Sequence, residues 1–190
     1  MSIQYLQSAT RQFTMYKQLA EKAMAQLPEE ELNWHANDDS NSVAAIIKHL
    51  QGNMLSRWTD FMTTDGEKPS RQRDAEFDNE VVTRATLMAR WEEGWQCLFA
   101  ALSSITDDDL NKIIYIRNEG HTVLEAINRQ IAHYSYHVGQ IVYISKLRTN
   151  QEWNTLSIPR NRSAEYNAGK FAQERAERHF TDEWIDKKVK

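Results

Sequence analysis

The sequence predicts an all-α fold, a four-helix bundle followed by a C-terminal arm. Four stretches repeat apolar residues at three- and four-residue steps, which is the period of a helix with one buried face. Only three prolines and six glycines interrupt the 190 residues, a low density of helix breakers. Four amphipathic helices bury their apolar faces by packing against one another, and this favours a bundle.

The apolar pattern also predicts where each helix begins and ends. One of Ser40, Asn41 and Ser42 is expected to cap the second helix, and Thr122 with Glu125 forms a capping box at the start of the fourth. The four helices are expected at residues 3–27, 43–61, 82–105 and 122–148.

The connections between these helices are less regular. Residues 63–79 are polar and charged, and they predict a surface crossover long enough for its two neighbouring helices to run parallel. Residues 113–116 are either a strand or an extended linker, and Gly94 permits close packing of the third helix. Residues 150–190 are polar, with a short helix expected around residues 171–185.

Composition restricts the possible partners and location. A formal net charge of −4 gives no general attraction to nucleic acid or anionic lipid, and no apolar run approaches the roughly 20 residues of a membrane span. Cys97 is the single cysteine, so no internal disulfide forms. The N-terminus lacks a signal-peptide pattern, and we expect a cytoplasmic protein. Most of the six tryptophans are expected in the core.

Three histidines give the strongest chemical signal. His133 and His137 are four residues apart on one helix, so both side chains face the same way and could bind one metal ion. His49 lies in the middle of another amphipathic helix, and all three histidines flank the apolar stripe of their helix. Such flanks form the groove between neighbouring helices. The alternative, that each is a half-buried histidine with an ordinary hydrogen bond, is equally compatible with the spacing.

The other histidines and the neighbouring tyrosines have simpler interpretations. His35, His121 and His179 are expected to be surface or capping residues, outside the metal set. Tyr134 should point toward the core and Tyr136 away from it, and neither is expected to be catalytic.

Several polar residues could support the site. Asn53 and Arg57 follow His49 on nearly the same face, where they either contact a ligand or serve solvation and bundle hydrogen bonding. Gln130 and Gln140 are possible partners for the outer nitrogens of metal-bound imidazoles. No general base is evident within a turn of the histidine pair, and the catalytic residues stay unknown.

The motifs Lys48-His49-Leu50 and His133-Tyr134-Ser135-Tyr136-His137-Val138-Gly139-Gln140-Ile141 carry a family resemblance. With the order of the helices, they resemble the DinB/YfiT-like metal-binding bundle superfamily. Residues 52–58 and 153–160 resemble a bacterial branch of it. The resemblance covers residues 1–170, leaves residues 171–190 as a charged C-terminal extension, and implies up-down-down-up connectivity.

The resemblance also implies a function. It places one divalent transition metal on His49, His133 and His137, and three protein ligands leave positions open for water or substrate. Zinc or nickel is preferred, and iron or manganese is also compatible. Some relatives resemble thiol S-transferases, so we expect such a transferase, or a related hydrolase, acting on a small electrophile. The alternatives are a non-catalytic, metal-stabilised scaffold or a small-ligand-binding stress protein. A homodimer is also implied.

Overall fold

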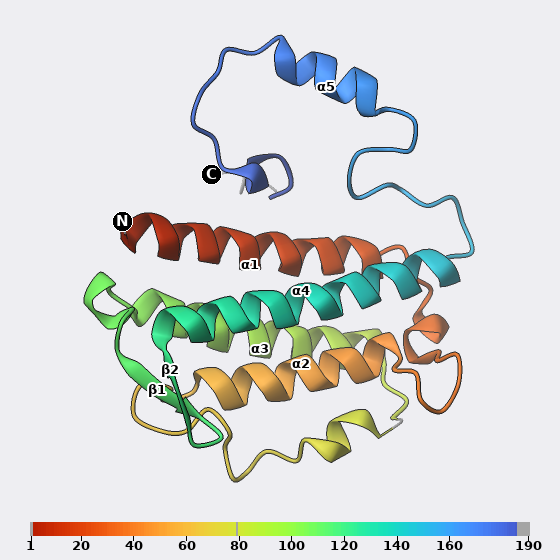
Figure 1. Cartoon of the computed structure of the whole chain (residues 1–190). Coiled ribbons are helices and arrows are strands. Elements are labelled where there is room, and N and C mark those ends of the chain that lie inside the picture. The colour runs from red at the N-terminus through yellow and green to blue at the C-terminus, as the bar shows by residue number, and fades with distance from the viewer. Residues whose placement is uncertain (1, 79, 186–190) are drawn as a thin grey trace.

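The chain is mostly helical, in agreement with the predicted fold class. The computed structural model describes residues 2–78 and 80–185. Figure 1 shows four long helices lying side by side, with a small hairpin at one end and an arm beyond. The long helices are α1 (Ser2–Met24), α2 (Val43–Trp58), α3 (Arg84–Ser104) and α4 (Val123–Arg148). The remaining elements are β1 (Ile113–Ile116), β2 (Glu119–Thr122), α5 (Ser163–Phe171) and the short 3-10 helices η1 (Glu29–Asn33), η2 (Asp74–Phe77), η3 (Asp107–Asp109) and η4 (Phe180–Glu183).

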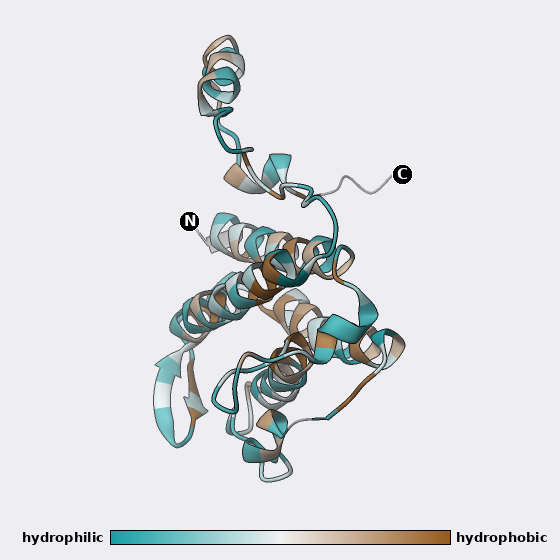
Figure 2. Ribbon diagram, turned by 90° about the vertical axis from the view of Figure 1, so that its right-hand side faces the viewer, coloured by the Kyte–Doolittle hydropathy of each residue, from teal (hydrophilic) through white to brown (hydrophobic). Residues whose placement is uncertain are grey.

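The helices pack most extensively in two pairs, α2 with α3 and α1 with α4. Gly94 allows the first pair to approach, because a Cβ there would lie 3.0 Å from Met54 Sδ and 3.2 Å from Gln51 Cα. The prediction that this glycine permits close packing is confirmed. The view along the bundle in Figure 2 shows the hydrophobic segments gathered where the helices face one another.

Aromatic rings from three helices fill the middle of the core. Trp95 on α3 lies 6.3 Å from Phe13 on α1 and 5.9 Å from Tyr134 on α4, measured between ring centroids. All three side chains are fully buried, as is Trp91. Trp58, Trp91 and Trp95 are buried in the core as predicted, whereas Trp34, Trp153 and Trp184 are half-buried, so the prediction holds for half of the tryptophans rather than for most. Aromatic contacts of this geometry stabilise the core beyond simple burial.

The helix starts follow the predicted capping chemistry. Ser42 is the N-cap of α2, and its hydroxyl accepts a hydrogen bond from the Ala45 amide at 3.1 Å. Thr122 and Glu125 form the predicted capping box of α4. These caps fix the register of the two helices that carry the predicted site.

The apolar run at residues 113–116 is a strand, which decides between the two predicted forms. It is β1 of an antiparallel hairpin whose turn residues, Arg117 and Asn118, both have positive φ. The Asp65 carboxylate accepts hydrogen bonds from both of their backbone amides, at 2.8 and 2.7 Å. The hairpin is thereby held against the crossover between α2 and α3.

That crossover is not the purely surface segment that its polar composition predicts. Glu76 is buried in η2, and the Arg71 side chain is only 4 % exposed. The prediction was wrong here because the charges of the segment are paired with one another and turned toward α2. Charged side chains are buried in this way when they are paired and hydrogen-bonded.

The C-terminal arm differs from the prediction in the position of its helix. The helix α5 covers Ser163–Phe171, earlier than expected, and η4 is the only helical turn described within residues 172–185. The arm returns to α1, where Ser8 and His179 are hydrogen-bonded at 2.9 Å. Residues 186–190, the end of the predicted charged extension, lie outside the described residues. No helix within the described ranges is sufficiently long and apolar to cross a membrane.

Candidate metal centre

The three predicted histidines converge on one point between α2 and α4. The Nε2 atom of His133 lies 3.3 Å from Nε2 of His49 and 3.1 Å from Nε2 of His137. Their candidate ligand atoms all lie within 4.8 Å of one another. The histidines therefore form a cluster that could bind a metal ion.

Hydrogen bonds of the buried Tyr134 fix the positions of the histidines beside it. His133 and His137 flank Tyr134, whose ring is fully buried. The Tyr134 hydroxyl accepts a hydrogen bond from Trp58 Nε1 at 3.1 Å and donates one to Asn53 Oδ1 at 3.1 Å. This contact ties α4 to α2 within a turn of each histidine. Tyr136 points away from the core and is exposed, as predicted for the two tyrosines, although its ring packs against His137.

The Nδ1 atom of each histidine, on the side of the ring away from the cluster, also contacts an oxygen acceptor. A carboxylate or amide oxygen only accepts hydrogen bonds, so the network assigns the proton of each ring to Nδ1 and leaves a lone pair on Nε2. Partners of this kind orient metal-bound imidazoles. The three contacts are His49 Nδ1 with Glu76 Oε2 (2.8 Å), His133 Nδ1 with Gln130 Oε1 (3.3 Å) and His137 Nδ1 with Gln140 Oε1 (2.8 Å).

The donor set fits a cation better than a network of imidazoles alone. With Nδ1 protonated in each ring, the two short Nε2 to Nε2 separations have no proton between them, and the lone pairs face one another. Nitrogen ligands at 2.0–2.1 Å from a tetrahedral zinc ion are roughly 3.3–3.4 Å apart. The observed separations of 3.3 and 3.1 Å are close to that value.

The local electrostatics keep two of the rings neutral. Burial lowers the pKa of His133 to about 3, and electrostatic interactions with the neighbouring His137, His49, Arg57 and Arg71 lower it further. Burial and the neighbouring His49 lower the pKa of His137 to about 4. A neutral imidazole is the form that binds a metal, so both rings are ready as ligands at neutral pH.

The remaining histidines stay outside the cluster, as predicted. His35 Nδ1 contacts the Asn37 carbonyl, and His121 Nε2 contacts Arg129. His179 caps η4.

A family model matches most of the chain. The model described as "Protein of unknown function (DUF1572)" matches residues 1–162. The chain belongs to the DUF1572 family. The matched region includes all four long helices and all three histidines and ends one residue before α5. A comparison with curated proteins finds no match.

In this DUF1572 chain, Glu76 is the residue of the site that the sequence did not predict. Arg71 binds both of its carboxylate oxygens, at 2.7 and 2.8 Å. Burial alone would raise the pKa of Glu76, but the hydrogen bonds from His49 and Arg71 outweigh burial and hold the pKa below its ordinary value. Glu76 therefore stays a carboxylate and keeps the proton of His49 on Nδ1.

Gly52 is the sequence signal that could have pointed to Glu76. It lies in the interior of α2, three residues after His49, where glycine is unfavourable for a helix by about 1 kcal/mol relative to alanine. A Cβ at this position would lie 2.2 Å from Glu76 Oε1. The glycine leaves the space that the carboxylate occupies.

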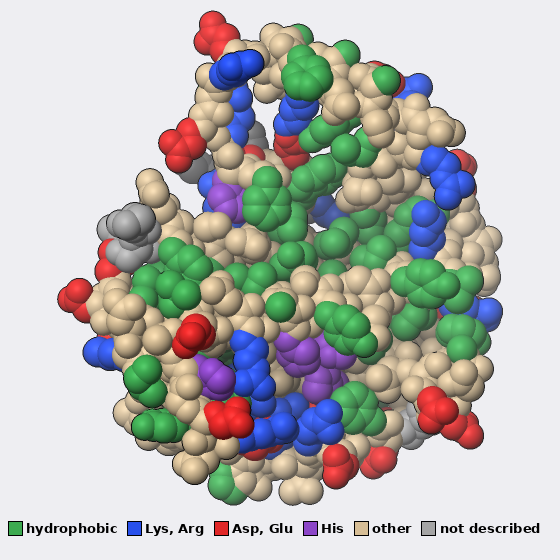
Figure 3. All heavy atoms as spheres, in the orientation of Figure 1, with side chains coloured by type: hydrophobic (Ala, Val, Ile, Leu, Met, Phe, Trp, Pro, Cys, Tyr) green, Lys and Arg blue, Asp and Glu red, His purple; other side chains and the backbone are tan. Residues whose placement is uncertain are grey.

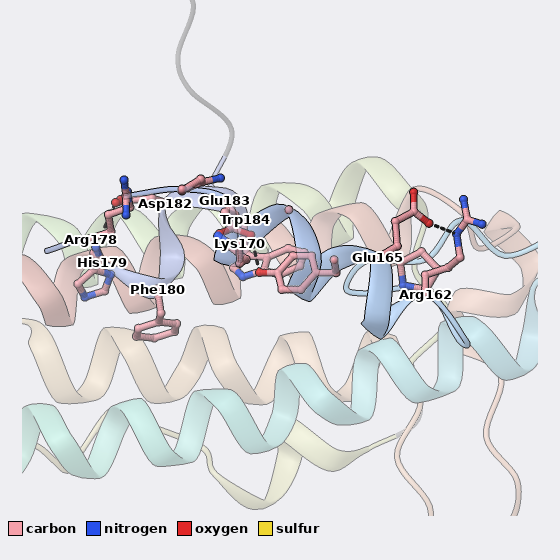
Figure 4. A pocket seen from close by; sticks show the side chains of 13 residues that line it. Arg162, Glu165, Lys170, Arg178, His179, Phe180, Asp182, Glu183 and Trp184 are labelled. Carbon is pink, nitrogen blue, oxygen red and sulfur yellow. Dashed lines mark hydrogen bonds and ion pairs between the residues drawn. The ribbon is translucent and has the colours of Figure 1, made fainter. Parts of the chain in front are cut away.

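A cavity of about 440 Å³ lies in front of the histidines of this DUF1572 protein. Figure 3 shows basic side chains gathered directly beside the histidines on this face. Asn53 and Arg57 both line the cavity and both are buried, so they do not serve simple surface solvation. A second cavity, of about 1020 Å³, lies in the arm among exposed ion pairs such as Arg162 with Glu165 (Figure 4).

Proposed function

We propose that this protein is a metal-dependent enzyme whose resident divalent ion is bound by His49, His133 and His137. The convergence of three Nε2 atoms, each on a ring held from behind by an acceptor, is the observation that carries the proposal. Zinc or nickel suits three imidazoles, and iron or manganese is compatible with them.

The chain's own residues divide the work at this site. Glu76, Gln130 and Gln140 hold the three rings in orientation through Nδ1. The residues lining the cavity, all within the described part of the chain, include no carboxylate and no histidine beyond the three. A general base is therefore not supplied by the lining.

A resident ion would supply the missing activation, because it lowers the pKa of a bound water and deprotonates a bound thiol. Three protein ligands leave room for such a molecule. We therefore propose thiol S-transfer to a small electrophile, or a related hydrolysis, with a thiol cosubstrate or water as the nucleophile.

The DinB/YfiT-like assignment belongs to the same proposal. It is supported by one ligand from the second long helix and two from the fourth, and by the crossover of residues 59–83 between α2 and α3. In Figure 1, α1 and α4 run in one direction and α2 and α3 in the other, which favours up-down-down-up connectivity. A homodimer in the cytoplasm, with no nucleic-acid or membrane partner, stays part of the proposal.

The decisive experiment is elemental analysis followed by turnover assays. The purified protein is compared with His133→Ala and His137→Ala, and helicity is checked by circular dichroism. We expect metal in the wild type and its loss from both folded variants. The loaded protein is then assayed with several thiols against epoxides and halides, and with ester and amide substrates. Metal-free wild-type protein would refute the site, and a loaded protein inactive on every substrate class would refute the enzyme.

The second candidate is a non-catalytic protein stabilised by its metal. The absence of a general base among the described lining residues favours it. In that case chelation would lower the melting temperature, and no substrate would be turned over.

A further inference from the structure

The cavity in front of the histidines is strongly basic. Five arginines line it, and no aspartate or glutamate is among the described lining residues. This arrangement runs against the whole chain, whose formal net charge is −4. The five are Arg57, Arg71, Arg73, Arg117 and Arg129.

We propose that the substrate of this site carries an oxyanion group, a carboxylate or a phosphate, which binds to Asn53 and Arg57 beside the histidines. Arg117 and Arg129 attract it at the rim of the cavity. This inference rests on the proposed metal site for the position of the reacting group, but the binding of the anion itself depends on α2 and the rim.

The charges around the cavity are not balanced by the protein. Three described carboxylates form ion pairs with the five guanidinium groups: Glu67, Glu76 and Asp74. Five positive charges against these three carboxylates leave an excess of two, or of one when Asp65, which interacts electrostatically with Arg57, is included. A cleft with one sign of charge concentrates ligands of the opposite sign.

Arg71 and Arg57 differ in how many of their guanidinium N–H groups have a hydrogen-bond partner. Arg71 binds both oxygens of Glu76 and also approaches Glu67, so its guanidinium is committed to the protein. Arg57 is 7 % exposed, and its Nη1 atom donates to Gly66 and, at 3.1 Å, to Glu67. Its Nε atom is buried without a partner among the described residues.

An unpaired buried N–H is unusual in a native protein and requires an explanation. The Nε and Nη2 atoms form one edge of a guanidinium, the edge that binds a carboxylate or phosphate through two parallel hydrogen bonds. No described residue accepts a hydrogen bond from the buried Nε of Arg57. An anion in the cavity would pair with this edge after the guanidinium rotates toward the cavity.

Asn53 adds a second hydrogen-bond donor on the same face of α2 as Arg57. It lies four residues after His49 and four before Arg57, so the three side chains share one face of α2. Its Oδ1 atom accepts from Tyr134, which assigns Nδ2 as the free, donating end of the amide. This face of α2 therefore presents, in order, the proposed metal ligand His49, the amide donor of Asn53 and the guanidinium of Arg57.

The rim arginines are suited to attraction rather than to rigid binding. Arg117 is carried on the hairpin turn and shares Glu67 through its Nε at 3.1 Å. Arg129 contacts only His121 among the described residues, so no carboxylate neutralises it. The cavity volume of about 440 Å³ admits a small molecule rather than a polymer.

The test is anion binding to the zinc-loaded full-length protein, measured by isothermal titration calorimetry. The probes are succinate, methyl phosphate and the neutral analogue succinamide. We expect one or both anions to bind at millimolar concentrations or below and succinamide not to bind. The tighter of the two anions distinguishes a carboxylate substrate from a phosphate substrate.

Variants assign the binding to the proposed residues. Asn53→Asp removes the donor with an isosteric acceptor, and the exposed pair Arg117→Gln with Arg129→Gln removes the rim charge. Each should weaken anion binding by about tenfold or more. The matched control is Arg160→Gln, an exposed arginine outside the cavity, which should leave binding unchanged. Binding that none of the site variants alters, or no binding of either anion, would overturn the proposal.

A repeat with His133→Ala separates this inference from the metal site. Anion binding that is retained in the metal-free variant and weakened by Asn53→Asp supports the anion site even if no metal is found in the wild type. Metal in the wild type without anion binding overturns the anion site alone. Anion binding lost in His133→Ala and unaffected by Asn53→Asp means that the anion binds only the ion, which also overturns the anion site.

Discussion

The arm cavity and the cavity in front of the histidines differ in the kind of residue that forms them. The arm cavity is more than twice as large, about 1020 against about 440 Å³. Its charged residues include exposed pairs within the arm, such as Lys170 with Glu183, and Asp182, which pairs with Arg11 of α1. The smaller cavity includes buried polar groups of α2 and α4, among them His49 and His137, each of which is fixed by a specific partner. Preorganised polar groups, rather than volume, mark the functional candidate.

The largest effect should come from His49→Ala. The variant removes the single ligand from α2 and leaves two on α4, so zinc affinity should fall by more than about 100-fold, beyond the range for outer partners. Competition with a fluorescent chelator measures the affinity. The control is His179→Ala, a histidine of the arm cavity, which should bind zinc as the wild type does. Equal losses of zinc affinity in His49→Ala and His179→Ala would contradict the assignment of the metal site to the smaller cavity.

Glu76→Gln tests the partner behind His49. Glutamine can still accept the Nδ1 proton, but it lacks the charge that makes the imidazole a stronger ligand, so zinc affinity should fall by about tenfold. Glu80→Gln is the control, because Glu80 lies nearby, pairs with Lys48 and Arg90, and does not contact a histidine. Unchanged affinity in Glu76→Gln would mean that the carboxylate only neutralises Arg71.

The contact between His49 and Glu76 shows how much of the site can be predicted from the sequence. His49, His133 and His137 could be predicted because helical spacing places them on flanking faces of two helices, and the caps at Ser42 and Thr122 fix those helices. Glu76 could not be predicted, because its position depends on how a polar crossover folds back onto α2. Periodicity carries no information about such a contact.

The arm shows that a weak apolar pattern does not predict the position of a helix. Its weak apolar pattern predicted a helix around residues 171–185, whereas α5 ends at Phe171. An exposed helix with no buried residues has no apolar face to set its position, so local preferences decide it.

A pair of glycine substitutions should give opposite results. In Gly52→Ala the new methyl group would lie 2.2 Å from Glu76 Oε1 and displace the carboxylate from His49, so zinc affinity should fall by about tenfold. In Gly139→Ala, on α4, no atom lies within 4 Å, and the unfolding free energy should rise by about 0.5–1 kcal/mol with zinc affinity unchanged. Chemical denaturation and the chelator assay measure both. A gain in stability without loss of zinc in Gly52→Ala would show that Glu76 moves freely.

The smallest effect is expected in the arm cavity. Lys170 pairs with Glu183 and lies 5.5 Å from the centre of the Tyr166 ring, but both charged side chains are more than a third exposed. Exposed pairs contribute little because water and salt screen them, so Lys170→Ala should change the unfolding free energy by no more than about 0.5 kcal/mol. Zinc affinity should not change. A large loss of stability would make the arm part of the cooperative core, and a loss of zinc would couple it to the histidines. Among the described residues, the arm meets α1, where His179 contacts Ser8 and Asp182 contacts Arg11, so such coupling would have to pass through α1 to the histidines of α4.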